Sequence, residues 1–521
     1  MSNLLARRLS TDAVAYGAVG SRPLDRLSIQ LCLMLMAAFL IRVWQFGNPV
    51  IHVDEQFYLL VGDRMLQGAL PYVDIWDRKP VGLFLIYAAI RTLGGEGIYQ
   101  YQIVATLFAG VTAFLIARIA LRISSGLGAA SAGIVYLCWL MIFGGDGGQS
   151  PVFYNAFVAG GALLTLRLVT TPSLSIGRLA NSGALIMLLV GLAMQVKYPA
   201  LFEGIFFGIA LMWTAWRVFH RPLVVTSLAA LWVTVALVPT ALAWAYYASL
   251  GHSEIFIFSN FLSIFNRPPS AAGDLISRLS EMVVFSIPLW LCAIAGIWGR
   301  FDAGALLPAE GAKTFLVSWL AAAVIGLLIP GTYYGHYYLP VLVPLSVLIA
   351  PLAGAPGTGI NLFTINRRQI TTPFIGVLAI MGLIAAKIQI NEDIWHLGDG
   401  SQIDRIAKVI EPRLKDCPFV FDFEPILYLM TNSCFNSRFV FPPHLASYWE
   451  TNAGGVNTLA EVQRILARKP SIIVSTAEIE HTPNPATWRL VQSELERHYR
   501  PIYSEKIGDR TRVVYERSGR H

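Results

Sequence analysis

The side chains most able to do chemistry are concentrated in one segment of the chain, residues 52–90. Asp54 and Glu55 stand side by side near its start, and Arg78 and Lys79 follow in the same segment. A carboxylate can take the proton of a hydroxyl group, while Lys and Arg side chains bind phosphate groups. The segment therefore combines a candidate general base with a candidate phosphate clamp.

Each of these two groups also has a structural interpretation. Acidic residues are common in the first turn of a helix, so Asp54 and Glu55 could simply begin a surface helix. Because adjacent helical residues point about 100° apart, the two carboxylates need not share one task. Arg78 and Lys79, which follow Asp77, could extend their charged ends toward anionic lipid headgroups.

The elements that must position these residues are indicated by composition. Of the 521 residues, 55% are hydrophobic and 14% are charged, and the mean hydropathy is +0.57. A water-soluble protein of this size cannot bury so much apolar surface, so lipid must solvate part of the chain. The net charge of +7 comes mostly from cations that flank apolar runs, which favours a role in membrane topology over nucleic-acid binding.

The apolar runs have the length of membrane-spanning helices. About eleven spans satisfy the length criterion. They are expected near residues 27–46, 100–118, 127–144, 151–167, 179–196, 200–216, 223–248, 276–299, 314–330, 337–353 and 371–390. The apolar piece Pro80–Ile90 is too short to span, and we expect it to lie at the membrane interface.

Lys and Arg residues fall in alternate loops of this arrangement, as the positive-inside rule requires. On the side of the N-terminal tail lie Arg7, Arg8, Arg22, Arg26, Arg118, Arg122, Arg167, Arg178, Arg217, Arg221, Arg300, Lys313, Arg367 and Arg368. We therefore expect a cytoplasmic tail over residues 1–26 and a transmembrane domain over 27–390, whose first periplasmic loop, 47–99, carries juxtamembrane helices. Residues 391–521 are expected to form a periplasmic domain.

The C-terminal segment has the pattern of a small α+β domain. Helices are expected over Ile403–Leu414 and Leu459–Ala467, and strands over Phe419–Phe423 and Ser471–Ser475. Cys417 and Cys434 belong to this segment, where an oxidising compartment would permit a disulfide. Their spacing leaves both a bridge and two free thiols open.

Four stretches of the sequence resemble a known family. They read VDEQFY, YVDIWDRKPVGLFLIYA, VGLAMQVKYPALF and YYGHYYLPVLVPLSVLIA, and they extend from about residue 54 to 350. They are similar to bacterial members of the GT-C superfamily, in particular to glycosyltransferase family 39 proteins related to protein O-mannosyltransferases and to the aminoarabinose transferase that modifies lipid A. The resemblance implies a polytopic α-helical GT-C fold and a glycosyltransferase of the inner membrane.

The resemblance also implies a reaction and roles for two residues. The donor would be a sugar carried on a polyprenyl phosphate, transferred with inversion to a glycolipid such as lipid A, to a polysaccharide or to a protein. Asp54 matches the family's acid in the first outward loop, the expected general base, with Glu55 beside it. Lys79, followed by Pro80, matches the family's phosphate-binding position.

Further candidates are spread along the chain. Lys197 and Arg267 are candidate phosphate ligands, although either could extend to lipid headgroups. His336 could bind phosphate or sugar. Tyr334 and Tyr337 are substrate-site candidates that could equally form an interfacial aromatic belt.

Three features bear on metal and sugar binding. Asp146 is the one acid of the second outward loop and is a candidate site residue. Arg78 stands where some relatives have an acid, and Asp77 precedes it, so sugar or metal binding could differ from theirs. A divalent metal remains possible, but Asp54, Glu55 and Asp146 make no ligand set defined by spacing.

Two other functional classes fit the same cations. A transporter or flippase of lipid-linked sugar would present them at the membrane surface, but such proteins usually show repeats or ionisable residues at the midplane. A relative that binds lipid-linked sugar without catalysis would retain Lys79. Release of polyprenyl phosphate from the donor separates the transferase from both.

Overall fold

The fold is described by a computed structural model that covers residues 26–298, 310–354, 368–479 and 482–518. The expected N-terminal tail before Arg26, and with it Arg7, Arg8 and Arg22, lies outside these residues, as do Arg300 and Arg367. The described chain divides into two compact units. Unit 1 comprises residues 1–44, 103–240 and 273–387, and unit 2 comprises 45–102, 241–272 and 388–521.

Ten helices of the described residues are long and apolar enough to cross a membrane. Their cores are α2 (Leu27–Arg42), α5 (Ile98–Ala120), α6 (Gly126–Leu140), α7 (Ser150–Val169), α8 (Ile176–Met194), α9 (Ala200–Phe219), α10 (Pro222–Ser249), α12 (Ala272–Trp298), α14 (Leu339–Ile349, extended at its start by the 3-10 turn Gly335–Tyr338 and at its end by α15, Pro351–Gly354) and α16 (Arg368–Leu397). The eleventh expected span is α13 (Ala312–Leu328), an apolar helix of 17 residues. Ten of the eleven expected spans thus have the length and composition to cross a membrane, and α13 is a shorter apolar helix.

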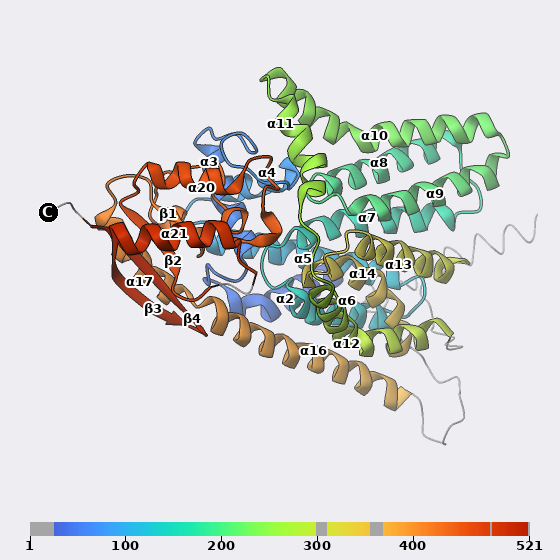
Figure 1. The fold of residues 1–521 in the computed structure, drawn as a ribbon. Coiled ribbons are helices and arrows are strands. Elements are labelled where there is room, and N and C mark those ends of the chain that lie inside the picture. Colours follow the sequence, from blue (N-terminus) through green and yellow to red (C-terminus); the bar gives the residue numbers. More distant parts are fainter. Residues whose placement is uncertain (1–25, 299–309, 355–367, 480–481, 519–521) are drawn as a thin grey trace, which may run out of the picture. The chain divides into compact units, whose positions relative to one another are not determined.

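Unit 1 is a bundle in which α7, α8 and α9 pack on one another, α13 packs on α9 and α14, and α14 packs on α6. The helices α7, α8 and α9 can be followed side by side in Figure 1. Apolar side chains cover the outer surface of many of these helices, as lipid contact requires. The α14 helix is buried on all sides within the bundle.

The first outward loop contributes two helices to unit 2. These are α3 (Val53–Leu66) and α4 (Val81–Arg91), and α4 begins and ends one residue later than the short helix expected over Pro80–Ile90. The two helices cross closely at Gly62, where an added Cβ would lie 2.6 Å from the Tyr87 carbonyl carbon. A glycine on α3 therefore permits the contact that packs α3 against α4.

The segment between α10 and α12 also belongs to unit 2. It forms α11 (Ser253–Ile257), a π-helical turn (Phe258–Leu262) and a 3-10 turn (Ser263–Asn266), after which comes Arg267. A single π turn inside helical structure often occurs at a functional site. In this protein it precedes a candidate phosphate ligand, Arg267, with one 3-10 turn between them.

The C-terminal part of unit 2 is the expected small α+β structure. Its sheet has the order β1-β2-β4-β3, with β1 (Phe419–Val420) parallel to β2 (Ile472–Thr476), and with β4 (Arg510–Arg517) antiparallel to β2 and to β3 (Tyr499–Ile507). The helices are α17 (Gly400–Ile410), α18 (Ile426–Met430), α19 (Pro443–Ala446), α20 (Thr458–Ala467) and α21 (Pro485–His498). Figure 1 shows α20 and α21 beside the sheet, at the orange and red end of the colour scale.

The hydrophobic core of this part includes a residue from far away in the sequence. Trp76 of the first loop is fully buried among Phe419, Phe421, Phe439 and Trp488. Its backbone N–H also donates to the carbonyl oxygen of Arg438 (2.8 Å). The loop that carries Arg78 and Lys79 is thus fixed by the core of the C-terminal sheet.

Candidate active site

Asp54 lies in the first turn of α3, where the chain changes from extended to helical. His52 is the N-cap, and its Nδ1 accepts a hydrogen bond from the Asp54 backbone N–H (3.3 Å). The partial positive charge of a helix N-terminus stabilises acids in this turn. The Asp54 side chain is partly exposed whereas Glu55 is fully buried, so the two neighbouring carboxylates lie in different surroundings.

Two side chains on α3 attach it to the C-terminal part of unit 2. The Gln56 amide donates to Glu424 (2.6 Å) and accepts from the Ile426 N–H (3.3 Å). At the other end of α3, Arg64 donates to the carbonyl oxygens of Ser433 (3.0 Å) and Tyr428 (3.3 Å). The helix that carries Asp54 is therefore held near both of its ends.

Lys79 lies beside Asp54. Its Nζ is 3.9 Å from an Asp54 carboxylate oxygen and 5.3 Å from the centre of the Tyr58 ring, which lies one turn further along α3. The side chains of Lys79 and Asp54 are 21% and 17% exposed. Since both ends of the pair reach the surface, an incoming ligand can contact them.

The backbone at Lys79 is held in a defined turn. One carboxylate oxygen of Asp77 accepts from the N–H groups of Arg78 (2.5 Å) and Lys79 (2.8 Å), and the Tyr72 hydroxyl donates to the Lys79 carbonyl oxygen (2.9 Å). Tyr72 itself has φ of 71°, a conformation that is costly for a residue with a bulky side chain. Asp77 thus serves the backbone of the turn.

Arg78 and Arg267 meet on one carboxylate, that of Glu450. Both terminal nitrogens of Arg78 contact Glu450, at 2.8 and 2.6 Å, and Nη2 of Arg267 lies 3.2 Å from it. Burial alone would raise the pKa of Glu450, but the two guanidinium groups lower that pKa to about 2. Glu450 is therefore a buried anion between two cations.

His444 packs against the same loop. Its ring centre is 4.7 Å from that of Trp76 and 5.1 Å from that of Phe441. Burial lowers the pKa of His444 to about 4, and the nearby charges of Glu450 and Asp77 only partly oppose this effect. The imidazole is thus neutral at physiological pH.

A second group of candidate residues lies in unit 1, between α8 and α9 and before α14. The Lys197 nitrogen is 3.8 Å from the centre of the Tyr337 ring, and the His336 ring is 4.7 Å from the same ring. Arg278 lies in the same way over Tyr334, at 4.3 Å. Tyr337 and Tyr334 thus each support a cation.

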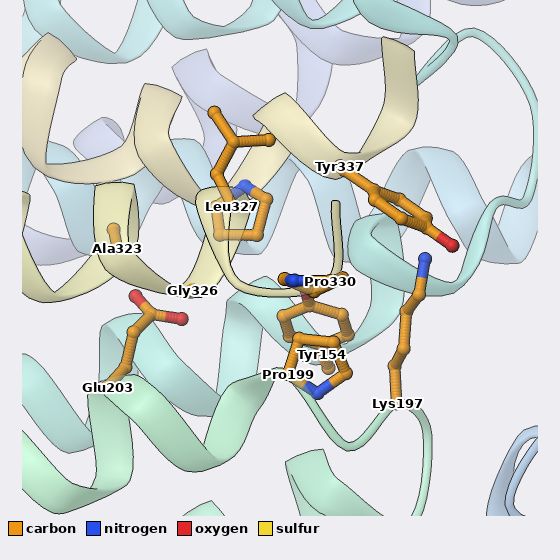
Figure 2. A pocket seen from close by; sticks show the side chains of 10 residues that line it. Tyr154, Lys197, Pro199, Glu203, Ala323, Gly326, Leu327, Pro330 and Tyr337 are labelled. Atoms are coloured by element: carbon orange, nitrogen blue, oxygen red, sulfur yellow. The ribbon is translucent and has the colours of Figure 1, made fainter. Parts of the chain in front are cut away.

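Lys197 and Tyr337 line a pocket with Tyr154, Pro199, Glu203 and residues of α13 (Figure 2). In this view the Lys197 nitrogen points toward the Tyr337 ring, and Glu203 lies on the other side of Pro199 and Tyr154. Glu203 is buried in a membrane span and accepts a hydrogen bond from Trp319 Nε1 (2.7 Å). The cavity measures about 10 Å³, roughly the room of one water molecule.

Asp146 is buried in the loop before α7. Arg42, at the end of α2, donates to the carbonyl oxygens of Gly145 and Gly147 on either side of it, and the second of these bonds is 2.6 Å long. Arg42 also donates to the Thr106 hydroxyl (3.0 Å). The loop that carries Asp146 is therefore ordered by a buried guanidinium.

The predicted residues divide between the two units. Unit 2 holds Asp54, Glu55, Asp77, Arg78, Lys79 and Arg267, and unit 1 holds Asp146, Lys197, Tyr334, His336 and Tyr337. Sequence reasoning missed Glu450 and His444, which no spacing distinguishes from other polar residues of the C-terminal domain. It also missed Glu203, although a single acid inside an apolar run is a recognised signal.

The described residues do not offer a metal site. Among them no group of three His, Cys, Asp or Glu side chains is arranged to hold an ion. The carboxylates of the candidate site already contact cations. Asp54 pairs with Lys79, and Glu450 pairs with the guanidinium groups of Arg78 and Arg267.

Solved structures similar to this chain are membrane glycosyltransferases, whereas no protein-family model and no curated protein matches its sequence. ArnT from Cupriavidus metallidurans bound to undecaprenyl phosphate matches with a TM-score of 0.61 at 15% identity, over 93% of this chain and 97% of that one. Its apo state also gives 0.61, at 14% identity and with the same coverage. An oligosaccharyltransferase from Archaeoglobus fulgidus tethered to an acceptor peptide gives 0.53 at 10% identity, over 95% and 74%. The chain therefore has the GT-C fold.

Proposed function

From this fold and site, we propose that the protein is a membrane glycosyltransferase that moves a sugar from a polyprenyl-phosphate donor to a hydroxyl group of a cell-envelope acceptor. The observation that carries the proposal is the pairing of Asp54 with Lys79 at 3.9 Å, on two segments that unit 2 holds rigidly. One side chain accepts a proton and the other stabilises a phosphate. Sugar transfer from a lipid phosphate needs a group that takes the proton of the attacking hydroxyl and a cation that binds the leaving phosphate, both within reach of one substrate.

The reaction is a single displacement at the anomeric carbon. Asp54 takes the proton of the acceptor hydroxyl, whose oxygen forms a bond to the anomeric carbon. The bond from that carbon to the phosphate oxygen breaks, its electron pair stays on the phosphate, and the configuration inverts. The Lys79 ammonium then leaves its ion pair with Asp54 and pairs with the leaving polyprenyl phosphate. Arg267 is the second cation that binds this phosphate.

The other candidates of unit 2 act around this pair. Asp77 holds the backbone turn that presents Lys79, and Arg78 is tied to Glu450. The buried Glu55 carboxylate lies behind Asp54 in the same helical turn. Lys197, His336 and Tyr337 of unit 1 form a separate group, which we propose as a second phosphate-binding position.

The donor class is supported by the ArnT structure that is similar to this chain, because that protein is bound to undecaprenyl phosphate. The acceptor class is a glycolipid such as lipid A, a polysaccharide or a protein. The proposed location is the bacterial inner membrane, with the N-terminus in the cytoplasm and residues 391–521 in the periplasm. The bridge between Cys417 and Cys434 supports an oxidising compartment for that domain.

The test is the substitution Asp54→Asn in purified protein supplied with lipid-linked sugars extracted from the native membrane. Loss of the base is expected to lower the release of polyprenyl phosphate by about 10²- to 10⁴-fold, with normal folding. Asp74→Asn is the matched control, since Asp74 is an exposed acid of the same loop that accepts from the Leu70 N–H. Unchanged turnover by Asp54→Asn would contradict the role of Asp54 as general base. Wild-type protein that moves the donor across a bilayer without releasing polyprenyl phosphate would contradict the proposed transferase activity.

A further inference from the structure

Glu450 joins three segments that are far apart in the sequence. Arg78 comes from the first outward loop, Arg267 follows the π and 3-10 turns between α10 and α12, and Glu450 closes a 3-10 turn, Tyr448–Glu450, in the C-terminal part of unit 2. Their side chains are only 9% to 17% exposed. A carboxylate at this point is the group that lets two guanidiniums lie close together.

The two arginines use Glu450 differently. Arg78 donates with both terminal nitrogens, the geometry that fixes a guanidinium most firmly. Its guanidinium carbon also lies 5.2 Å from the centre of the Trp76 ring, and Trp76 is part of the C-terminal core. The Arg78 side chain is therefore held by two contacts, one with Glu450 and one with the Trp76 ring.

Arg267 makes fewer contacts than Arg78 with Glu450 and its neighbours. Its Nη2 contacts Glu450 at 3.2 Å and its Nε approaches the carbonyl oxygen of Trp449 at 3.4 Å. Among the described residues, Nη1 of Arg267 has no acceptor, and the side chain is 17% exposed. One edge of this guanidinium is thus held in place while the other can donate to a ligand.

We propose that Glu450 is a positioning residue that holds Arg267 in the orientation required to bind the phosphate of the donor. This inference rests on the proposed function and adds a residue to it from the C-terminal domain. Arg78 anchors Glu450, and Glu450 in turn fixes Arg267. The C-terminal domain thereby contributes to donor binding through an arginine that belongs to a loop of the membrane region.

The sign of one binding measurement distinguishes positioning from simple electrostatics. The probe is undecaprenyl phosphate, titrated into the full-length protein in detergent. Glu450→Gln keeps the shape of the side chain but removes a negative charge near the phosphate, so electrostatics alone predicts tighter binding. Positioning predicts binding about tenfold weaker, because Arg267 loses its fixed orientation.

A double-mutant cycle assigns the effect to Arg267. Arg267→Gln alone is expected to weaken binding by about tenfold or more. In that background Glu450→Gln is expected to cause no further loss, since the group that it positions is gone. Equal, additive losses in the two backgrounds would overturn the inference.

Two further variants keep the test decisive. If Glu450→Gln does not fold, Glu450→Asp keeps the charge but shortens the side chain by one methylene, so positioning predicts weaker binding and electrostatics predicts no change. Glu461→Gln is the matched control, because Glu461 also pairs with an arginine, Arg464, but on α20. Wild-type protein that does not bind the probe would count against the proposed function, whereas wild-type binding with tighter binding by Glu450→Gln would overturn the positioning role alone.

Discussion

The two units hold their cations in different ways. In unit 2, Lys79, Arg78 and Arg267 each contact a carboxylate, although Lys79 and Arg78 also lie over the rings of Tyr58 and Trp76. In unit 1, Lys197 and Arg278 lie over the rings of Tyr337 and Tyr334. A carboxylate neutralises a cation and can exchange it for another anion, whereas an aromatic face attracts a cation without cancelling its charge.

This difference indicates a division of work within the proposed reaction. Ion pairs that exchange partners suit a step in which a proton moves and a phosphate leaves, and we therefore propose that the chemical step takes place in unit 2. Cations on aromatic rings keep their full charge for an anionic ligand, which suits binding of the donor in its ground state. Only interactions that strengthen in the transition state raise turnover, so substitutions in the two units should affect different kinetic constants.

Among substitutions of these cations, the largest expected effect is that of Lys79→Gln. Losing the cation beside Asp54 should lower kcat for polyprenyl phosphate release by about 10²- to 10³-fold, as loss of a group that stabilises transition-state charge typically does. Lys197→Gln should instead raise KM for the donor by about tenfold with little change in kcat. Steady-state kinetics of both variants measure kcat and KM. If the two variants change these constants in the same way, the proposed division of work between the units is wrong.

Breaking the disulfide should destabilise unit 2 selectively. Cys417 and Cys434 are 17 residues apart, and a bridge over a loop of this size contributes about 3 kcal/mol. The bridged segment includes Glu424 and Ser433, which hold the ends of α3, so turnover should fall with stability. Thermal unfolding of Cys417→Ser is compared with Cys32→Ser, an exposed cysteine of α2. Equal melting temperatures would contradict the prediction.

A smaller effect is expected from pH, again in unit 2. The pKa of His444 falls from its ordinary value of 6.5 to about 4 on folding, because the imidazole is buried. Below pH 6.5 His444 is protonated in the unfolded chain but stays neutral in the folded chain. The free energy of unfolding therefore decreases as the pH falls toward 4. At pH 5 the loss is about 2 kcal/mol, from about 1.5 units at 1.36 kcal/mol each. Unfolding at pH 7 and pH 5 measures it, and His444→Leu should show a correspondingly smaller change.

The sequence predicted the membrane helices and the short α4 helix because these depend on local apolar length. It also selected Asp54 and Lys79, which share one loop, and the structure places them 3.9 Å apart. Of the C-terminal elements it found β1, β2, α17 and α20. It missed the β3–β4 hairpin, whose turn at Gly508 has φ of 61° and whose Gly-Asp pair is a turn signal.

What the sequence could not predict depends on contacts between distant segments. The insertion of Trp76 into the core around Trp488 is set by the packed shape of that core, and no local pattern marks it. The same is true of Glu450, whose role comes from Arg78 and Arg267. The order of the strands, with β4 between β2 and β3, likewise follows from packing and not from strand propensity.

The smallest expected effect tests the aromatic support of Lys197 in unit 1. Tyr337→Phe keeps the ring face, so binding of undecaprenyl phosphate should change by less than about twofold. Tyr337→Leu removes the face and should weaken binding by about fivefold, the equivalent of roughly 1 kcal/mol for a cation–π contact. Tyr99→Leu, at an exposed tyrosine of α5, is the control.

If both Tyr337 variants bind normally, the tyrosine belongs to an interfacial belt. If Tyr337→Phe loses as much as Tyr337→Leu, the hydroxyl group makes the contact, and the contrast between paired cations in unit 2 and ring-supported cations in unit 1 no longer holds.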